Sequence, residues 1–309
     1  MRLAFMGTPE FAVPTLAALL DSRHEVVFVI TQPDKPKGRG MHVQSPPVKE
    51  LALEKGVRIF QPPSLKDNAE ILDLMTDSKL DTVIVVAYGK MIPSPMLAVP
   101  SKGFINIHAS LLPDLRGASP INRAIMSGHT ITGISIMQID EGMDSGPLFL
   151  QERVPIHDTD DAESLSKRLS AIGSAKLLET LNLMEKDSLE AIPQEHSRAT
   201  YAPLLTKEDG RIDWGRDPKS IHNLIRGLVP WPCGYTYMYG KMLKIMSGTY
   251  EIEDHGIMQG TLIREKAGVK IACSGGYIIP KTLQLEGKKS LDAAAFSCGL
   301  KADRMVLGT

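Results

Sequence analysis

Residues 1–31 read MRLAFMGTPEFAVPTLAALLDSRHEVVFVIT, and this stretch decides the fold of the first half of the chain. Two apolar runs of strand length, Leu3 to Met6 and Val26 to Thr31, enclose a segment from Thr15 to Leu20 whose apolar residues recur at helical steps. A strand, a helix and a second strand predict a right-handed crossover between parallel strands.

The same alternation continues beyond this stretch. Helix-like patterns follow at Val48 to Leu53 and Ala69 to Met75, and further strand-like runs lie at Thr82 to Ala87, Phe104 to Ile107 and Ile134 to Ile139. The sequence therefore predicts an α/β domain with a doubly wound, mostly parallel, Rossmann-like sheet. Ligands of such sheets bind outside the carboxyl ends of the strands.

The end of the first predicted strand argues against a nicotinamide cofactor. It runs into Gly7-Thr8-Pro9-Glu10, which lacks the G-x-G-x-x-G fingerprint, and no acidic residue closes the second strand near Ile30. We therefore do not expect a dinucleotide-binding oxidoreductase.

The second half of the chain has a different pattern. Residues Asp160 to Asp187 predict one long amphipathic helix, and residues Ala191 to Thr206 are polar and irregular. Beyond them come short strand-like runs separated by glycine-containing turns, at Tyr235 to Met238, Met242 to Tyr250, Gly260 to Ile263, Val269 to Cys273 and Tyr277 to Leu285. We expect a first domain over 1–190, a linker over 191–207 and a small β-barrel, OB-like, over 208–309.

Composition is that of a globular chain, with 309 residues, 43% apolar residues and a net charge of -1. The charge is uneven, because residues 209–309 hold 14 Lys and Arg against 10 Asp and Glu. That excess is compatible with a nucleic-acid partner and equally with an ordinary solvated surface.

Cysteine usage and the N-terminal sequence predict a cytoplasmic protein. Cys233, Cys273 and Cys298 form no C-x-x-C pair, so neither a disulfide framework nor a zinc ribbon is expected. The first apolar run is too short for a signal peptide, and no stretch approaches the ~20 apolar residues of a membrane helix.

Two polar residues share one face of the strand predicted at Phe104 to Ile107. Asn106 and His108 are two positions apart, so their side chains point the same way and Ile105 and Ile107 point the other way. An amide donor beside a titratable ring can stabilise an oxyanion and move a proton, the two tasks of acyl transfer. The alternative is a satisfied polar pair at a strand end.

Two loops supply further candidates. Ser110-Leu111-Leu112-Pro113 follows the strand directly, and the acidic loop Asp140 to Pro147, with Asp144, follows the strand at Ile134 to Ile139. The acidic loop lacks the alternating pattern of a calcium site, and no G-x-S-x-G elbow indicates a serine hydrolase. Without other evidence the loops could equally be a connector and a solvated turn.

Taken together, Asn106-Ile107-His108, Ser110 to Pro113 and Asp144-Ser145-Gly146-Pro147 resemble the signature of the 10-formyltetrahydrofolate-dependent transferases. The resemblance implies that Asn106, His108 and Asp144 are the catalytic set. It implies 10-formyltetrahydrofolate as co-substrate, no metal, and folate contacts from Ser110, Leu111, Leu112, Pro113, Ala87, Tyr88 and Asp140.

The resemblance extends over the whole chain to the family members that act on methionine esterified to initiator tRNA. It includes Phe5 to Ala12, Ser45 to Lys49, the segment Gly227 to Pro232 and the late run Leu291 to Phe296. One departure is Gly146-Pro147, where a Gly-Asp pair is frequent, and it leaves the catalytic set intact. The C-terminal domain matches the tRNA-binding appendage of those members.

The partners follow from that resemblance. The basic loop Lys35 to Gly40 fits a segment that closes on phosphates, and the resemblance implies that Lys35, Lys37 and Arg39 contact the tRNA acceptor end. By its residues alone the loop could be merely solvated. Trp231, between two prolines, is expected to anchor a core or a domain junction.

Two rival functions stay open at this point. One is formyl transfer to a sugar nucleotide or ribotide, and the other is a catalytically idle RNA-binding protein. No feature indicates an oligomer, and a monomer is expected.

Overall fold

The computed structural model describes residues 1–37 and 42–308, which form two compact units. The first unit comprises Met1–Pro120, Ile131–Pro155 and Ser166–Ala202. The second comprises Ile121–Thr130, Ile156–Leu165 and Pro203–Thr309. Two helices, α5 (Pro120–Met126) and α6 (Ala162–Glu185), contribute residues to both units.

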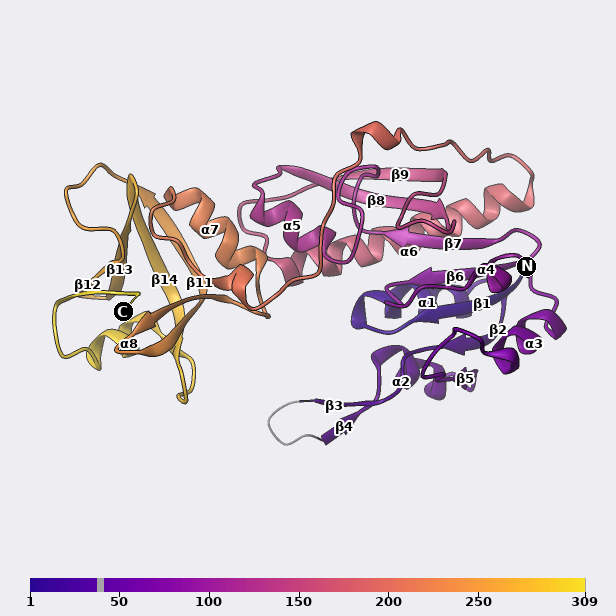
Figure 1. Ribbon diagram of the computed structural model, residues 1–309, viewed down its shortest axis with the longest axis horizontal. Helices are drawn as coiled ribbons and strands as arrows, with labels where there is room; N and C mark the ends of the chain where they lie inside the picture. The colour runs from indigo at the N-terminus through magenta and orange to yellow at the C-terminus, as the bar shows by residue number, and fades with distance from the viewer. Residues whose placement is uncertain (38–41, 309) are drawn as a thin grey trace. The chain divides into compact units, whose positions relative to one another are not determined.

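A seven-stranded sheet forms the centre of the first unit (Figure 1). Its order is β5 (Arg58–Phe60), β2 (Glu25–Ile30), β1 (Arg2–Gly7), β6 (Thr82–Val86), β7 (Phe104–His108), β8 (Ile131–Gln138) and β9 (Leu148–Pro155). The pairs from β5 to β7 are parallel. The α/β class with a mostly parallel, Rossmann-like sheet is confirmed.

Helices cover both faces of this sheet, which explains why its central strands are almost continuously apolar. On one face, alternate residues such as Met6, Val85 and Phe104 pack with α3 (Ala69–Asp77) and α4 (Ser94–Leu97). On the other face lies α6, in which Gly173 leaves room for Ile107 and Ile134 of the sheet. Helices α1 (Val13–Leu20) and α2 (Pro47–Glu54) complete the helical layers.

The strand direction changes at β8. Strand β8 pairs antiparallel with β7 and with β9, and His108 lies opposite Ser135 while Ile105 lies opposite Gln138. The loop after β8 therefore starts at the edge where β7 begins, not at the edge where the parallel strands end. To reach His108, this loop has to fold back across the sheet.

The second unit contains a curled antiparallel sheet. Its order is β10 (Gly234–Met238), β11 (Lys241–Ile252), β14 (Gly276–Leu285), β13 (Gly268–Cys273), β12 (Thr261–Glu265) and β16 (Arg304–Val306), with β15 (Leu291–Asp292) beside β14. Gly308 N donates to Tyr237 O at 2.8 Å, so the segment after β16 meets β10. The expected small barrel is confirmed, with α7 (Pro218–Gly227) and α8 (Ala293–Cys298) adding to its core.

The segment expected as a loop after β2 carries a short hairpin, in which β3 (Lys35–Lys37) pairs with β4 (His42–Gln44). Across the described parts of the chain, no helix is long and apolar enough to cross a membrane.

Candidate active site

Strand β7 brings the two predicted polar residues to one face of the sheet, the face that Phe104 shares. His108 is buried, with 6% of its surface exposed, whereas Asn106 is half-buried. Within residues 1–37 and 42–308, the Asn106 amide makes no side-chain hydrogen bond. A half-exposed amide without a partner is available to donate to a ligand.

Both ring nitrogens of His108 face an oxygen. Nε2 lies 3.0 Å from Leu115 O, and Nδ1 lies 3.5 Å from Oδ2 of Asp144. Because a carbonyl can only accept, the neutral tautomer that fits this contact has its proton on Nε2 and a lone pair on Nδ1. Nδ1 is the ring nitrogen that faces the Asp144 carboxylate.

Main-chain groups hold Asp144 in place. Gly117 N donates to its Oδ2 at 2.8 Å, and Asp144 itself takes a left-handed backbone conformation with φ +49°. Earlier in the same loop, Asp140 accepts from Gly142 N at 3.0 Å and from the Ser145 hydroxyl at 2.8 Å. Asp140 thus folds the start of the loop, and its role as a folate contact stays a prediction.

The segment from Ser110 to Pro113 is fastened through its main chain. The Ser135 hydroxyl donates to Ser110 O at 2.7 Å and accepts from Leu112 N at 3.0 Å. The side chains of Ser110 and Leu112 are buried, and the Ser110 hydroxyl already donates to Asp114 O. The half-buried Leu111 and Pro113 are the side chains of this segment that a ligand can reach.

The carboxyl end of β6 holds the next two candidates. Ala87 is exposed with φ +47°, but the Tyr88 side chain is buried in the apolar core, and its hydroxyl has no partner among the described residues. Burial raises the Tyr88 pKa to about 12, so this phenol stays protonated. A folate contact by Tyr88, as predicted, would have to use its main chain.

Ammonium groups gather near this edge. Lys35 Nζ donates to Gln32 Oε1 at 2.8 Å, and Gln32 Nε2 donates to Tyr88 O at 2.7 Å. Burial lowers the pKa of Lys90, and the nearby charge of Lys35 lowers it further. Lys35 is thus close to the strand ends, whereas Arg39 and the side chain of Lys37 lie outside the described residues.

Sequence reasoning missed several residues that support this site. Gln32 and Lys90 belong to the strand ends, and Arg116, Gln194 and Thr200 bond to the loops around His108 and Asp144. Arg116 lies three residues after the Ser110 to Pro113 motif and could have been noticed as a charge beside Gly117. The other residues carry no local signal.

Cysteine thiols and possible metal ligands are the remaining groups to consider. Burial raises the pKa of the Cys233 and Cys273 thiols, so neither is a reactive thiolate. Within the described residues, no group of three His, Cys, Asp or Glu side chains is placed to hold a metal ion.

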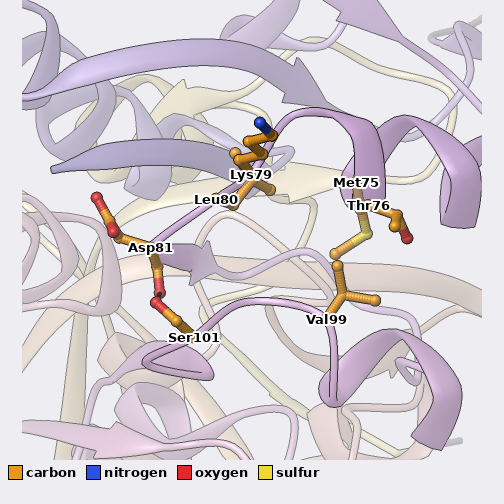
Figure 2. A pocket seen from close by; sticks show the side chains of 7 residues that line it. All are labelled: Met75, Thr76, Lys79, Leu80, Asp81, Val99 and Ser101. Atoms are coloured by element: carbon orange, nitrogen blue, oxygen red, sulfur yellow. Dashed lines mark hydrogen bonds between the residues drawn. The ribbon is translucent and has the colours of Figure 1, made fainter.

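An open hollow of about 360 Å³ lies at the opposite end of β6, where the strand begins. Figure 2 shows the side chains around it. It is lined by Met75, Thr76, Lys79, Leu80, Asp81, Val99 and Ser101. None of the residues predicted for catalysis or binding lines it. The candidate site is therefore at the other edge of the sheet.

Comparisons with known proteins show the family of the chain. The family model described as "Formyl transferase" matches residues 1–181, and "Formyl transferase, C-terminal domain" matches residues 204–301. The chain belongs to the formyl transferase family. In this formyl transferase, the N-terminal match contains β7 and the Asp144 loop.

Two curated relatives of this formyl transferase are named methionyl-tRNA formyltransferase. The one from Geotalea daltonii is 45% identical over 97% of this chain and 96% of its own length. The one from Acetivibrio thermocellus is 41% identical over 97% of both chains. The solved structure of WlaRD, a sugar 3N-formyl transferase, covers 94% of this chain and 99% of its own with a TM-score of 0.68 at 17% identity, which shows the fold.

Proposed function

We propose that this formyl transferase moves the formyl group of 10-formyltetrahydrofolate to the α-amine of methionine on initiator tRNA, for translation initiation. The observation that carries the proposal is the unpartnered Asn106 amide beside the His108 and Asp144 pair. Its acceptor is supported by the methionyl-tRNA formyltransferases that are similar over nearly the whole chain.

Asn106 stabilises the charge that develops on the formyl oxygen. When the amine attacks the formyl carbon, the formyl oxygen gains negative charge, and the Asn106 amide donates to it. One such donor is worth about 3 kcal/mol of the barrier. His108 can add a second donor only if its Nε2–H turns from Leu115 O, so Asn106 carries most of this stabilisation.

His108 and Asp144 transfer the proton from the attacking amine to the leaving nitrogen. The attacking amine loses a proton as the new C–N bond forms, and the N10 nitrogen of the folate gains one as its C–N bond breaks. His108 Nδ1 holds the proton in between, next to the Asp144 carboxylate, which stabilises the imidazolium. Asp144 therefore acts on the charge of the ring and on its orientation.

The residues at the strand ends fit the folate chemically. Leu111 and Pro113 offer half-buried apolar side chains to a flat ring system, and the exposed main chain at Ala87 offers polar groups to its edge. The ammonium group of Lys90 suits the glutamate carboxylates. This assignment is tested by measuring the KM for the folate in a Lys90→Met variant, and an unchanged KM would contradict it.

We assign catalysis to residues 1–190 and tRNA binding to residues 208–309, joined by the linker 191–207. The positive excess of residues 209–309 and the basic segment at Lys35, Lys37 and Arg39 support contact with phosphates. The chain works as a monomer in the cytoplasm, where initiator tRNA is charged. Light scattering at working concentration tests the monomer, and a dimer mass would overturn it.

The release of tetrahydrofolate tests the proposed function. The protein is mixed with 10-formyltetrahydrofolate and charged initiator Met-tRNA, and tetrahydrofolate should form only when both are present. Release with a sugar nucleotide or ribotide alone would support a different formyl acceptor. No release with any acceptor would support an idle RNA-binding protein.

A further inference from the structure

We propose that Gln194, Arg116 and Thr200 are positioning residues that set the distance and orientation of the His108 and Asp144 pair. Gln194 and Thr200 belong to the segment 192–202, expected from the sequence as part of a linker. The inference rests on the proposed formyl transfer, because it concerns His108 and Asp144, to which proton transfer is assigned.

The Asp144 loop needs support because of the sheet topology. It starts at the edge of the sheet where β7 begins, yet Asp144 reaches His108 at the end of that strand. At its end, Gly146 lies so close to Gln138 O that a Cβ would be 2.0 Å from it. Asp144, with φ +49°, holds a conformation that costs a non-glycine residue free energy.

Gln194 supplies that support. Its side chain is buried, with 6% exposed, and its Nε2 donates to Asp144 O at 2.9 Å and to Gly146 O at 2.7 Å. Both hydrogens of the amide are used on one loop. A buried amide bonded in this way holds the main chain on each side of Ser145.

Arg116 fixes the direction of the Gln194 amide. Its Nε and Nη2 donate to Gln194 Oε1 at 3.2 and 2.7 Å, and Nη2 also lies 3.0 Å from His196 Nδ1. With its oxygen facing the guanidinium, Gln194 has to present its N–H groups to the loop. Arg116 is itself 4% exposed, and over residues 1–37 and 42–308 it forms no ion pair with a carboxylate.

Thr200 acts on the other member of the pair. Its Oγ1 accepts from Leu115 N at 2.8 Å, and Leu115 O accepts from His108 Nε2 at 3.0 Å. Arg116 N also donates to Thr200 O at 2.9 Å. The 192–202 segment therefore fixes the acceptor that decides which nitrogen of His108 carries the proton.

A Gln194→Glu variant separates positioning from a merely structural role. The carboxylate keeps the bonds from Arg116, with an added opposite charge, but cannot donate to Asp144 O or Gly146 O. A structural role that consists of satisfying Arg116 is retained in this variant. Loop positioning is lost, and we expect kcat to fall by about 10- to 100-fold with KM for both substrates within about threefold of the wild type.

Thr200→Val and Thr200→Ser form the second comparison. Valine removes the acceptor for Leu115 N, and serine restores it with nearly the same bond. We expect the valine variant to lose about tenfold in kcat and to shift the pH profile of kcat, and the serine variant to recover both. Melting temperatures identify any variant that fails to fold.

Wild-type protein in the same assay keeps the two hypotheses apart. If the wild type transfers no formyl group, the proposed function fails. If the wild type is active and folded Gln194→Glu and Thr200→Val match its kcat and pH profile, the positioning role is overturned. A loss of kcat that follows melting temperature and is not rescued by serine would also overturn it.

Discussion

Replacing Asp144 by asparagine removes one charge and keeps the shape of the side chain. The amide oxygen can still accept from Gly117 N, so the loop keeps its main anchor. What disappears is the negative charge that lies 3.5 Å from His108 Nδ1. The change therefore isolates the electrostatic contribution of Asp144 to the protonated ring.

The size of the effect follows from that distance. Two unit charges 3.5 Å apart interact by about 4.7 kcal/mol at an effective dielectric constant of about 20, which suits a side chain near the surface. The ring is neutral before the transition state and protonated in it, so removing the Asp144 charge raises the activation free energy by most of this amount. We expect kcat to fall roughly a thousandfold.

Single-turnover transfer measures this loss without interference from product release. Glu141→Gln is the matched control, because it removes one negative charge from the same loop at an exposed position. We expect the control to keep near-normal turnover and both variants to keep the wild-type melting temperature. Near-normal single-turnover rates in folded Asp144→Asn would refute the role assigned to its charge.

Four further outcomes are expected. Asn106→Asp replaces the oxyanion donor by a like charge, so single-turnover transfer should fall by at least about a hundredfold, and an unchanged rate would refute the donor role. Neutralising the three basic residues Lys35, Lys37 and Arg39 should raise KM for tRNA and flatten its salt dependence while folate binding, followed by calorimetry, survives. Tyr88→Phe removes a buried hydroxyl that has no partner in the described part of the chain, so denaturant unfolding should show a gain of about 1 kcal/mol, and a loss would indicate a partner. Burial lowers the His222 pKa, and the charge of Arg226 lowers it further. Below the unfolded value of about 6.5, the unfolded chain therefore binds a proton that the folded chain does not bind. The denaturant midpoint of unfolding should therefore decrease as the pH is lowered from 7 to 5, and it should decrease less in His222→Gln. The same decrease in both proteins would contradict this.

Local sequence pattern was sufficient for the elements with a clear period. The two-residue spacing of Asn106 and His108 correctly placed both on one face of β7, and the apolar runs Leu3 to Met6 and Val26 to Thr31 marked β1 and β2. Helix α7 was missed although a signal was present. Asp217 caps it, and Ile221, Leu224 and Ile225 follow at helical steps.

Strand direction and long-range contacts could not be predicted in this way. An apolar run has the same pattern in a parallel and an antiparallel strand, so nothing in Ile134 to Ile139 indicates that β8 reverses. The edge strand β9 was missed because polar residues interrupt its apolar pattern. Gln194 bonds to the main chain of Asp144, 50 residues away, and a main-chain acceptor carries no residue type to recognise.

The decisive experiment compares the initial rates of formyl transfer from 10-formyltetrahydrofolate to three acceptors. These are charged initiator Met-tRNA, charged elongator Met-tRNA and a ribotide. We expect formyl-methionine to form on the initiator tRNA at a rate far above that on the other two acceptors. Transfer to the ribotide alone, or no transfer to any acceptor, would contradict it.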